Sequence, residues 1–507
     1  MMRRIVSVFL AAAVSLAVWA AASAAQAAVF IPTKTTDSAD GACTPQDCSL
    51  REAILAANQN PGDDVILLHA GTYTLTIPGT GEDLGATGDL DVQGNLVLLG
   101  DGAASTIVDG GGLDRIFQVP DGVTVEIRDV TLRNGRAPGL GGAILNAGNL
   151  TLLRSLVTGN ASVAGPEGPG FGGGLYSNGN HASLTVTQST FANNSSQRGG
   201  GGLAAGGAVS LANDTISNNH ADADFGGGLY VFGTSRAVAN NVTIVENSAL
   251  RGGGLLVEDN AFIGIAPVIS NSIIAGNTAK TSQPDCWGPV DSSYNLIGFA
   301  DVTCNGPSAA NHDVVGIGVP IPAKVGALQS VGGPTPVRPL GPGSPALDAG
   351  NPAPPGSPRA CEPVDQRGAA RPGTLSAGSP RCDIGAYEAT SACVAGGPIL
   401  CLSGSRFLVT ASWKTFLGLT GSAQGVELTP DSGYFWFFDP ANVELTLKVL
   451  NACSLNNRFW VFLSGLTDVE VTLTVTDTKT GTVKIYTNPQ GQTFKTVLDT
   501  GAFSTCP

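Results

Sequence analysis

Two short hydrophobic motifs alternate along the middle of the chain, and their spacing predicts a repeat architecture. The first is Gly-Gly, a small residue and an aliphatic residue, and it begins at residues 141, 172, 200, 226 and 252. The second is an aliphatic residue or Phe followed three positions later by Asn, and it begins at residues 157, 191, 216, 244 and 274. Successive Gly-Gly motifs are 31, 28, 26 and 26 residues apart, a period that indicates stacked structural repeats.

Each repeat contains two or three short runs of β-branched and aliphatic residues separated by Gly and Asn, as in residues 183–194. No 3.6-residue apolar stripe recurs in these runs, which excludes helical repeats. One repeat cannot bury its own apolar side, whereas stacked repeats form a continuous core with a parallel sheet along each side. We therefore predict an all-β fold in which residues 62–320 form a parallel β-helix, a pectate-lyase-like solenoid. We expect it to be right-handed, because parallel crossovers within one sheet nearly always are.

Glycine, asparagine and the low content of charge fit this architecture. Glycine accounts for 69 of 507 residues, roughly double its average usage, and tight corners need the positive φ that glycine adopts without strain. Charged residues make up 13% of the chain, and like charges stacked ~5 Å apart would repel by about 1 kcal/mol even in water. The asparagines of the second motif are predicted to form a hydrogen-bonded ladder along the axis: Asn160, Asn194, Asn219, Asn247 and Asn277.

One well-capped helix is predicted near the start of this β-rich chain. Ser49 and Glu52 match the Ser-x-x-Glu capping box, and Pro61-Gly62 ends the helix. An apolar stripe with helical spacing follows the box: it consists of Leu50, Ala53, Ile54 and Ala57. Because a solenoid exposes its core at its open ends, we predict that residues 28–61 form an N-terminal cap whose helix covers the first coil. A free helix that binds a partner is the alternative.

The first 27 residues have the pattern of a secretory signal peptide. Arg3 and Arg4 precede an apolar run at residues 5–21, and residues 25–27 form a small-x-small cleavage site. An uncleaved membrane anchor is the alternative. No other run reaches the ~18 apolar residues of a membrane span. We therefore expect a protein that is secreted, extracellular or on a bacterial cell surface, with no membrane span after signal cleavage.

The chain is acidic and contains ten cysteines. Its formal charge of −14 becomes −16 when the two arginines of the signal peptide are subtracted. An acidic chain repels phosphate, so we expect no nucleic-acid partner. An oxidising compartment favours disulfides between sequence neighbours, and metal thiolate sites are not expected because no Cys-x-x-Cys occurs. The neighbours are Cys43 and Cys48, Cys286 and Cys304, Cys361 and Cys382, and Cys393 and Cys401, which leaves Cys453 and Cys506.

Residues 321–392 are proline-rich and are predicted to form a C-terminal cap segment. Prolines bias a chain to extended structure, and a flexible linker is the usual interpretation of such composition. A Cys361–Cys382 clamp argues against a linker. Charged residues around the clamp suggest an ion-pair network, for which we favour a structural role over an active site, because buried Arg–carboxylate clusters often only fix geometry. These residues are Asp365, Arg367, Arg371, Asp383 and Glu388.

Residues 393–507 are predicted to form an antiparallel β-sandwich, because apolar residues alternate at period two with turn signals every 8–12 residues. The predicted strands lie at 443–450, 459–465, 469–477 and 483–488. In the aromatic run, Tyr434, Trp436 and Phe438 share one face, and Phe435 and Phe437 share the other. One face must be core, and the other either packs under a loop or forms a platform for sugar stacking. Tyr434 and Trp436, with Trp460, are the candidate ligand-binding residues.

Few polar residues in the repeats could support catalysis. Hydrolases need two carboxylates ~5–10 Å apart, and lyases need a Ca²⁺ site and a Lys or Arg base. Asp222 and Asp224, beside His220, are the best candidate catalytic pair, and a solvated turn is the alternative interpretation. An acidic cluster is the candidate site for a structural Ca²⁺, the one cofactor that we consider: it consists of Glu82, Asp83, Asp89 and Asp91.

Several stretches resemble known secreted bacterial proteins. Residues 48–58, CSLREAILAAN, and residues 83–96 resemble the signature of CSLREA-type right-handed β-helix proteins. Residues 345–352, 365–372 and 382–388 resemble the closing element of the choice-of-anchor Q group of bacterial surface proteins. The alternating repeats are similar to those of polymorphic outer-membrane proteins, which are autotransported adhesins. The chain ends in Thr505-Cys506-Pro507 and not in the aromatic residue with which those adhesins end, so autotransport is not expected.

The resemblance implies a surface or secreted role and implies no catalytic residue. Our first hypothesis is a non-catalytic, adhesin-like protein that presents an extended surface to a polysaccharide or to a cell-surface glycan or protein. The alternative is a polysaccharide lyase or a glycoside hydrolase on the β-helix scaffold. The outer surface of the coils distinguishes the two hypotheses. A groove with clustered carboxylates favours the enzyme, and a smooth face of Ser, Thr and Asn favours the binding protein.

Overall fold

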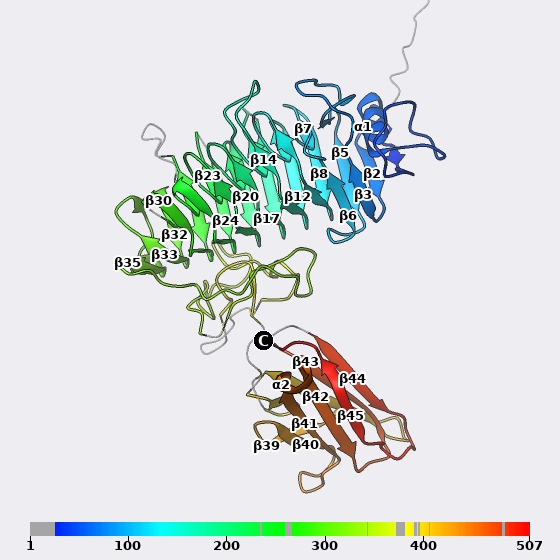
Figure 1. The fold of residues 1–507 in the computed structure, drawn as a ribbon. Helices are drawn as coiled ribbons and strands as arrows, with labels where there is room; N and C mark the ends of the chain where they lie inside the picture. The colour runs from blue at the N-terminus through cyan, green and yellow to red at the C-terminus, as the bar shows by residue number, and fades with distance from the viewer. Residues whose placement is uncertain are drawn as a thin grey trace, which may run out of the picture.

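The computed structural model describes residues 26–506, apart from 180, 234–235, 259–265, 283, 342, 372–380, 390–392, 394–395, 405 and 479–481. Most of the predicted signal peptide, residues 1–25, therefore lies outside the described residues. The chain forms a β-solenoid, an irregular segment beside it and a separate β-rich lobe (Figure 1). No helix in the described ranges has the length and apolar character needed to cross a membrane.

Four parallel sheets, here named A to D, run along the solenoid. Sheet A has ten strands: β1 (Val29–Phe30), β2 (Asp64–Leu68), β5 (Leu96–Gly100), β8 (Thr124–Arg128), β12 (Asn149–Leu153), β16 (Ser183–Thr187), β20 (Ala208–Ala212), β24 (Arg236–Asn240), β28 (Val268–Ser270) and β32 (Asp291–Ser293). Sheet B also has ten: β3 (Gly71–Thr74), β6 (Thr106–Asp109), β9 (Thr131–Arg133), β13 (Leu156–Thr158), β17 (Thr190–Ala192), β21 (Thr215–Ser217), β25 (Thr243–Val245), β29 (Ile273–Ala275), β33 (Leu296–Ala300) and β35 (Val314–Ile317).

Sheets C and D complete each coil. Sheet C has nine strands: β4 (Leu90–Asp91), β7 (Phe117–Val119), β11 (Ile144–Asn146), β15 (Leu175–Ser177), β19 (Leu203–Ala205), β23 (Leu229–Val231), β27 (Leu255–Val257), β31 (Cys286–Pro289) and β34 (Cys304–Asn305). Sheet D has six: β10 (Arg136–Ala137), β14 (Ala161–Ser162), β18 (Ser195–Ser196), β22 (His220–Ala221), β26 (Ser248–Arg251) and β30 (Thr278–Ser282). The predicted parallel β-helix is confirmed, and its first strand, β1, begins upstream of residue 62 because Val29 pairs with Val65.

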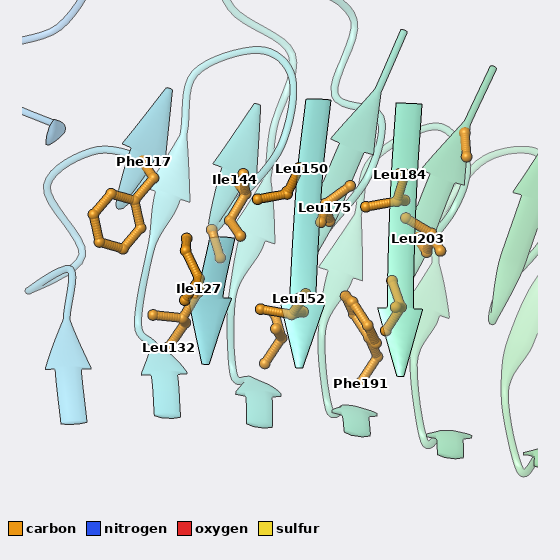
Figure 2. Packing of buried hydrophobic residues seen from close by; sticks show 14 of the residues in the cluster. Phe117, Ile127, Leu132, Ile144, Leu150, Leu152, Leu175, Leu184, Phe191 and Leu203 are labelled. Atoms are coloured by element: carbon orange, nitrogen blue, oxygen red, sulfur yellow. The ribbon is translucent and has the colours of Figure 1, made fainter. Parts of the chain in front are cut away.

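The core of the solenoid is a continuous column of aliphatic and aromatic side chains (Figure 2). Side chains alternate across a strand, so Leu150 and Leu152 of β12 are buried while the other residues of the strand are only partly buried. The parallel register repeats this pattern of buried positions from coil to coil, so that Leu150 lies opposite Val125 of β8 and Leu184 of β16. Each fully buried Leu or Val contributes about 1.5–3 kcal/mol relative to exposure, so the column holds the coils together.

The asparagine ladder predicted from the second motif is confirmed. Asn194 accepts hydrogen bonds through its Oδ1 from the backbone N–H and from the Nδ2 of Asn160, both at 3.0 Å. Asn194 in turn donates through its Nδ2 to Oδ1 of Asn219 at 3.0 Å. The pattern continues through Asn247 and Asn277 and ends at Asp285, which accepts from Asn277. The ladder therefore satisfies backbone N–H groups that are buried at the corner.

The Gly-Gly motif has two physical requirements at its corner. The first glycine is in the left-handed region, as at Gly172 with φ 69°, which other residues adopt only with strain. The second glycine leaves no room for a side chain, since a Cβ on Gly173 would lie 2.3 Å from the carbonyl oxygen of Gly201. The corner between sheets A and B instead uses non-glycine residues with positive φ, including Asn213 and Asn241. These positions were not predicted from the sequence.

The predicted N-terminal helix is α1 (Leu50–Gln59) at the open end of the solenoid (Figure 1). The capping box is present, because Ser49 Oγ accepts from the Glu52 N–H at 3.1 Å and Glu52 accepts from the Ser49 N–H at 2.7 Å. The apolar stripe joins the same core cluster as Ile66 of β2. Arg51 is buried, pairs with Asp37 at 2.8 Å and donates to backbone carbonyls of the loop before β4. The helix is therefore a lid fixed to the first coil.

The proline-rich segment lies along the outer face of sheet B and not over the last coil, where an end cap was expected (Figure 1). A short 3₁₀ helix, η1 (Ala309–Asn311), precedes β35, after which the chain returns along the solenoid. The segment is held by hydrogen bonds to threonines of sheet B. Gln366 accepts from Thr215 Oγ1 at 2.6 Å, and the Ala386 N–H donates to Thr243 Oγ1 at 2.9 Å. These outward threonines need partners, which explains the lateral position.

Five disulfides join the ten cysteines, and the pairing of sequence neighbours is confirmed. The bonds are Cys43–Cys48, Cys286–Cys304, Cys361–Cys382, Cys393–Cys401 and Cys453–Cys506.

The C-terminal lobe has two antiparallel sheets of five strands each, as predicted. One contains β36 (Leu400–Leu402), β37 (Phe407–Lys414), β38 (Thr420–Ser422), β43 (Glu470–Asp477) and β44 (Val483–Asn488). The other contains β39 (Gln424–Thr429), β40 (Ser432–Trp436), β41 (Leu445–Ala452), β42 (Arg458–Gly465) and β45 (Val497–Phe503), and α2 (Cys453–Asn456) follows β41. Phe407, Phe435 and Phe459 belong to the core that both sheets share.

Candidate functional site

Large side chains form a row on the outer face of sheet C. In β15 the first and third residues are buried, so the middle residue, Tyr176, points outward. The same position on the next coils is occupied by Ala204, Tyr230, Leu256 and Trp287, which lie in register. Aromatic rings thus recur at every second coil, about 10 Å apart if neighbouring strands are ~4.8 Å apart.

Phenylalanines flank this row on both sides. Phe171 and Phe225 precede β15 and β23, and Phe232 follows β23. Ring centroids lie 5.7 Å apart for Phe171 and Tyr230, and 5.6 Å apart for Tyr176 and Phe232. We name the set the aromatic strip: Phe171, Tyr176, Phe225, Tyr230, Phe232 and Trp287.

The rings meet over the coil of β19 because that coil has small residues at the corresponding positions. A Cβ on Gly199 would lie 3.1 Å from Phe171, and a Cβ on Gly206 would lie 3.0 Å from Phe232. Tyr230, at the centre, is only 5% exposed, whereas the other rings of the strip are partly exposed. The strip therefore presents aromatic surface across several coils while its centre is fixed by packing.

Charged groups of both signs border the strip. The guanidinium of Arg251 lies 5.7 Å from the ring centroid of Phe225 and 5.1 Å from that of Trp287. The Tyr230 hydroxyl donates to Glu258. Burial raises the pKa of Tyr230, and the carboxylate of Glu258 raises it further, so the hydroxyl stays protonated at neutral pH. The border can thus donate and accept hydrogen bonds without a net charge of one sign.

Asp222 and Asp224, the candidate catalytic pair, are held by different partners. Asp222 pairs with His220 at 2.8 Å, and Asp224 pairs with Arg198 at 2.5 Å. Both follow β22, at the border of the strip, and the backbone N–H of Asp224 donates to the carbonyl of Arg198 at 3.1 Å. Each carboxylate is therefore held by a basic partner of its own, within or beside the turn that follows β22.

The acidic cluster near the N-terminus does not converge on one point. Glu82 accepts from the backbone of its own loop, Asp83 accepts from Gln118, Asp89 pairs with Arg115 at 2.6 Å, and Asp91 accepts from the Gly85 N–H at 2.8 Å. Burial raises the pKa of both Asp89 and Asp91 to about 7. Across the described part of the chain, no three His, Cys, Asp or Glu side chains are arranged to hold a metal ion. The geometry therefore gives no support to the candidate Ca²⁺ site.

The sandwich aromatics also separate into distinct places. Phe435 and Phe437 are core residues, which puts Tyr434 and Trp436 on the outer face of the sheet, both half-buried. Trp460 is on β42, two strands away from Tyr434. On the intervening strand, β41, Tyr434 lies opposite Thr446 and Trp460 lies opposite Leu450, four residues further along.

A strand spacing of ~4.8 Å and a rise of ~3.4 Å per residue put Tyr434 and Trp460 about 16 Å apart. Phe438, which was expected to share the face of Tyr434, packs edge-on against Trp413 with centroids 4.7 Å apart. The three candidate ligand-binding residues therefore do not form one platform.

The aromatic strip was missed by the sequence analysis, although a signal for it exists. The hexapeptide Phe-Gly-Gly-Gly-Leu-Tyr occurs at both 171–176 and 225–230, so the first Gly-Gly motif carries an aromatic residue on each side at two of its five positions. The neighbouring sheet A is different, since its outward middle positions on β12, β16 and β20 are Thr151, Thr185 and Ser210.

Comparison with known protein families supports the handedness of the solenoid. The family model described as "Right handed beta helix region" matches residues 116–286, which include every Gly-Gly motif and the whole aromatic strip except Trp287. A comparison with curated proteins gives no match. The solenoid is therefore a right-handed β-helix, a fold that suits an extended binding surface and also serves as an enzyme scaffold.

Proposed function

We propose that the protein is a non-catalytic, secreted or cell-surface protein that binds an extended polysaccharide along sheet C. The observation that carries the proposal is the aromatic strip, whose rings other than Tyr230 are partly exposed and are spread along the solenoid axis from the coil of β15 to that of β31. Exposed aromatic rings that are contiguous over several coils are unusual on a surface without a ligand or partner.

The chemistry of the strip suits sugars. The C–H-rich face of a pyranose packs on an aromatic ring, and its hydroxyls both donate and accept hydrogen bonds. The mixed charges of Arg251 and Glu258 favour a neutral chain over an acidic one.

The surface location rests on three features of the chain. The signal-peptide pattern of residues 1–27 and the five disulfides are both typical of exported proteins. A cell-surface role is added by two likenesses: that of residues 48–58 and 83–96 to CSLREA-type proteins, and that of residues 345–352, 365–372 and 382–388 to choice-of-anchor Q proteins.

An array of purified neutral and acidic polysaccharides tests the proposal with the intact protein. We expect binding to a neutral polymer, and at least a tenfold loss of affinity when Tyr176→Ala and Trp287→Ala are combined. Thr185→Ala, on the outer face of sheet A, is the matched control and keeps full affinity. Thermal unfolding of each variant confirms that the solenoid is intact.

Two results would overturn the proposal. Undiminished binding by the double variant would show that the aromatic strip is not part of the binding surface. Release of reducing ends or of unsaturated products from any polymer would instead identify a hydrolase or a lyase. Asp222→Asn and Asp224→Asn would then show whether the ion-paired turn takes part in that activity.

A further inference from the structure

A cavity of about 560 Å³ lies between the outer face of sheet A and the proline-rich segment. Its volume is within the range of small-ligand pockets, roughly 300–1,000 Å³. Strands β24 and β28 provide one wall, and residues 355–363 provide the other. It lies on a different sheet from the aromatic strip and shares no lining residue with it. Five of its residues determine its chemistry: Val238, Asn240, Val268, Arg359 and Glu362.

The wall formed by residues 355–363 is fixed in place. Asn240 Nδ2 donates to the carbonyl of Ala360 at 2.8 Å, and the Glu362 N–H donates to Asn241 Oδ1 at 2.9 Å. The Cys361–Cys382 disulfide ties the same stretch to the rest of the segment. Arg359 has a φ of 57°, a conformation that is strained for a non-glycine residue and that persists only where surrounding contacts enforce it. The cavity is therefore preformed.

The cavity combines an apolar wall with polar groups of opposite charge. Val238 points outward from the middle of β24 and is 44% exposed, and Val268 lies opposite it in register on β28. Glu362 accepts from Asn240 Nδ2 at 2.8 Å through one carboxylate oxygen. Arg359 pairs with Asp291 at the rim through one amino group. One positive and two negative charges around a partly apolar site disfavour an anionic ligand and provide acceptors for hydroxyl groups.

We propose that this cavity binds a single neutral pyranose, such as the terminal unit of a glycan chain. The apolar face of the sugar lies on Val238 and Val268, and its hydroxyls bond to the carboxylate of Glu362 and the guanidinium of Arg359. The proposal extends the proposed function to a second site of the same ligand class. It can fail while binding along the aromatic strip stands, because the two sites are on different sheets.

Ligand-observed NMR on the intact protein tests the cavity with methyl β-D-glucopyranoside, methyl α-D-mannopyranoside and methyl β-D-galactopyranoside. D-Galacturonic acid is the anionic comparison. We expect saturation transfer to at least one neutral glycoside and none to the uronic acid. Val238→Phe fills the cavity from the outside of the sheet without touching the core, and it should weaken that binding at least tenfold. Glu362→Gln keeps the acceptor for Asn240 and should weaken it at least threefold.

The matched control is Thr185→Phe, which places the same ring at the equivalent outward position of β16, in register with Ser210 and Val238. It should leave glycoside binding unchanged, and Val238→Phe should leave polysaccharide binding along the strip unchanged. The proposal is overturned if no neutral glycoside binds, if Val238→Phe and Thr185→Phe have equal effects, or if the uronic acid binds as well as the neutral sugars.

Discussion

Sheets B and C enclose the same apolar column, yet their outer faces differ in what covers them. Sheet B is covered by the proline-rich segment of the chain itself, through buried polar side chains such as Gln366, Arg338 and Arg371. Arg338, for example, donates to Ser217 Oγ at 2.8 Å and pairs with Glu246. Sheet C carries the aromatic strip, whose rings are only partly buried by one another.

The difference shows how the two faces are used. A buried hydrogen-bonding group that lacks its partner costs more free energy than the hydrogen bond contributes when it is made. The outer face of sheet B therefore fits one partner, the proline-rich segment of the same chain. Aromatic rings need no such partner and tolerate several neighbours. We therefore propose that the covered face serves stability and the aromatic face serves binding, and the following predictions test that division.

The largest effect is expected from Arg371→Gln on the covered face. Arg371 pairs with Glu388 at 2.7 Å and donates to the carbonyl of Gly385 at 2.7 Å and to Asn213 Oδ1 at 3.2 Å. Removing one member of a buried pair costs about 3–5 kcal/mol, because the other charge stays buried without compensation. Hydrogen exchange in residues 361–371 measures the loss, and exchange should rise there before it rises in the Asn ladder.

Polysaccharide binding by folded Arg371→Gln protein should match that of the unaltered protein. A variant that stays folded and protected but no longer binds the polymer would place the covered face in the binding function, which would contradict the division between the two faces.

The solenoid was predictable because each coil repeats local requirements at the same positions. Gly172 needs a positive φ and Asn194 needs an identical neighbour above and below, and both needs appear in the sequence at a fixed period. The N-terminal helix was predictable because its signal is also local: the capping box needs only Ser49 and Glu52, which lie within four residues. The position of the proline-rich segment was not, because it depends on single contacts such as that of Gln366 with Thr215, 151 residues apart.

The candidate site was harder to predict than the fold. Whether Tyr176 or Leu175 faces outward depends on the cross-section of the coil, and a three-residue strand is too short to show alternation. The aromatic run around Trp436 attracted attention because its residues are adjacent in sequence, whereas the rings of the strip come together only through stacking of coils. Asp222 and Asp224 are two residues apart in the sequence, yet they are held by different partners, His220 within the same turn and Arg198 on the preceding coil.

An intermediate effect is expected from pH on the covered face. Burial raises the pKa of Glu388 to about 7, with a further rise from the charge of Asp383, and burial raises the pKa of Asp383 to about 6. Their unfolded values are ~4.3 and ~3.9, so between about pH 4 and 7 the folded state binds more protons than the unfolded state. Stability therefore falls as pH rises through that window.

Thermal unfolding of the protein at pH 5, 6, 7 and 8 measures this fall. Asp91 and Asp285, whose pKa values burial raises to about 7 and about 6, add to it with the same sign. Glu388→Gln removes one titrating group from the covered face alone, so the dependence of stability on pH should become shallower. The variant thereby separates the contribution of the covered face from those of Asp91 and Asp285. A midpoint that rises from pH 5 to pH 7, or an identical slope in Glu388→Gln, would show that the acids of the covered face are not protonated on folding.

The smallest effect on stability is expected from Arg251→Gln, the same substitution as at Arg371 but on the aromatic face. Arg251 is exposed and lies over the rings of Phe225 and Trp287, and cation–π contacts at exposed sites contribute about 0.5–1 kcal/mol. Polymer affinity should fall severalfold, because the guanidinium donates at the border of the strip. Titration with the polymer identified on the array, beside hydrogen exchange of sheet C, measures both quantities. If Arg251→Gln lost as much stability as Arg371→Gln and no affinity, the aromatic strip would be packing for the solenoid, and the covered and aromatic faces would differ in composition but not in role.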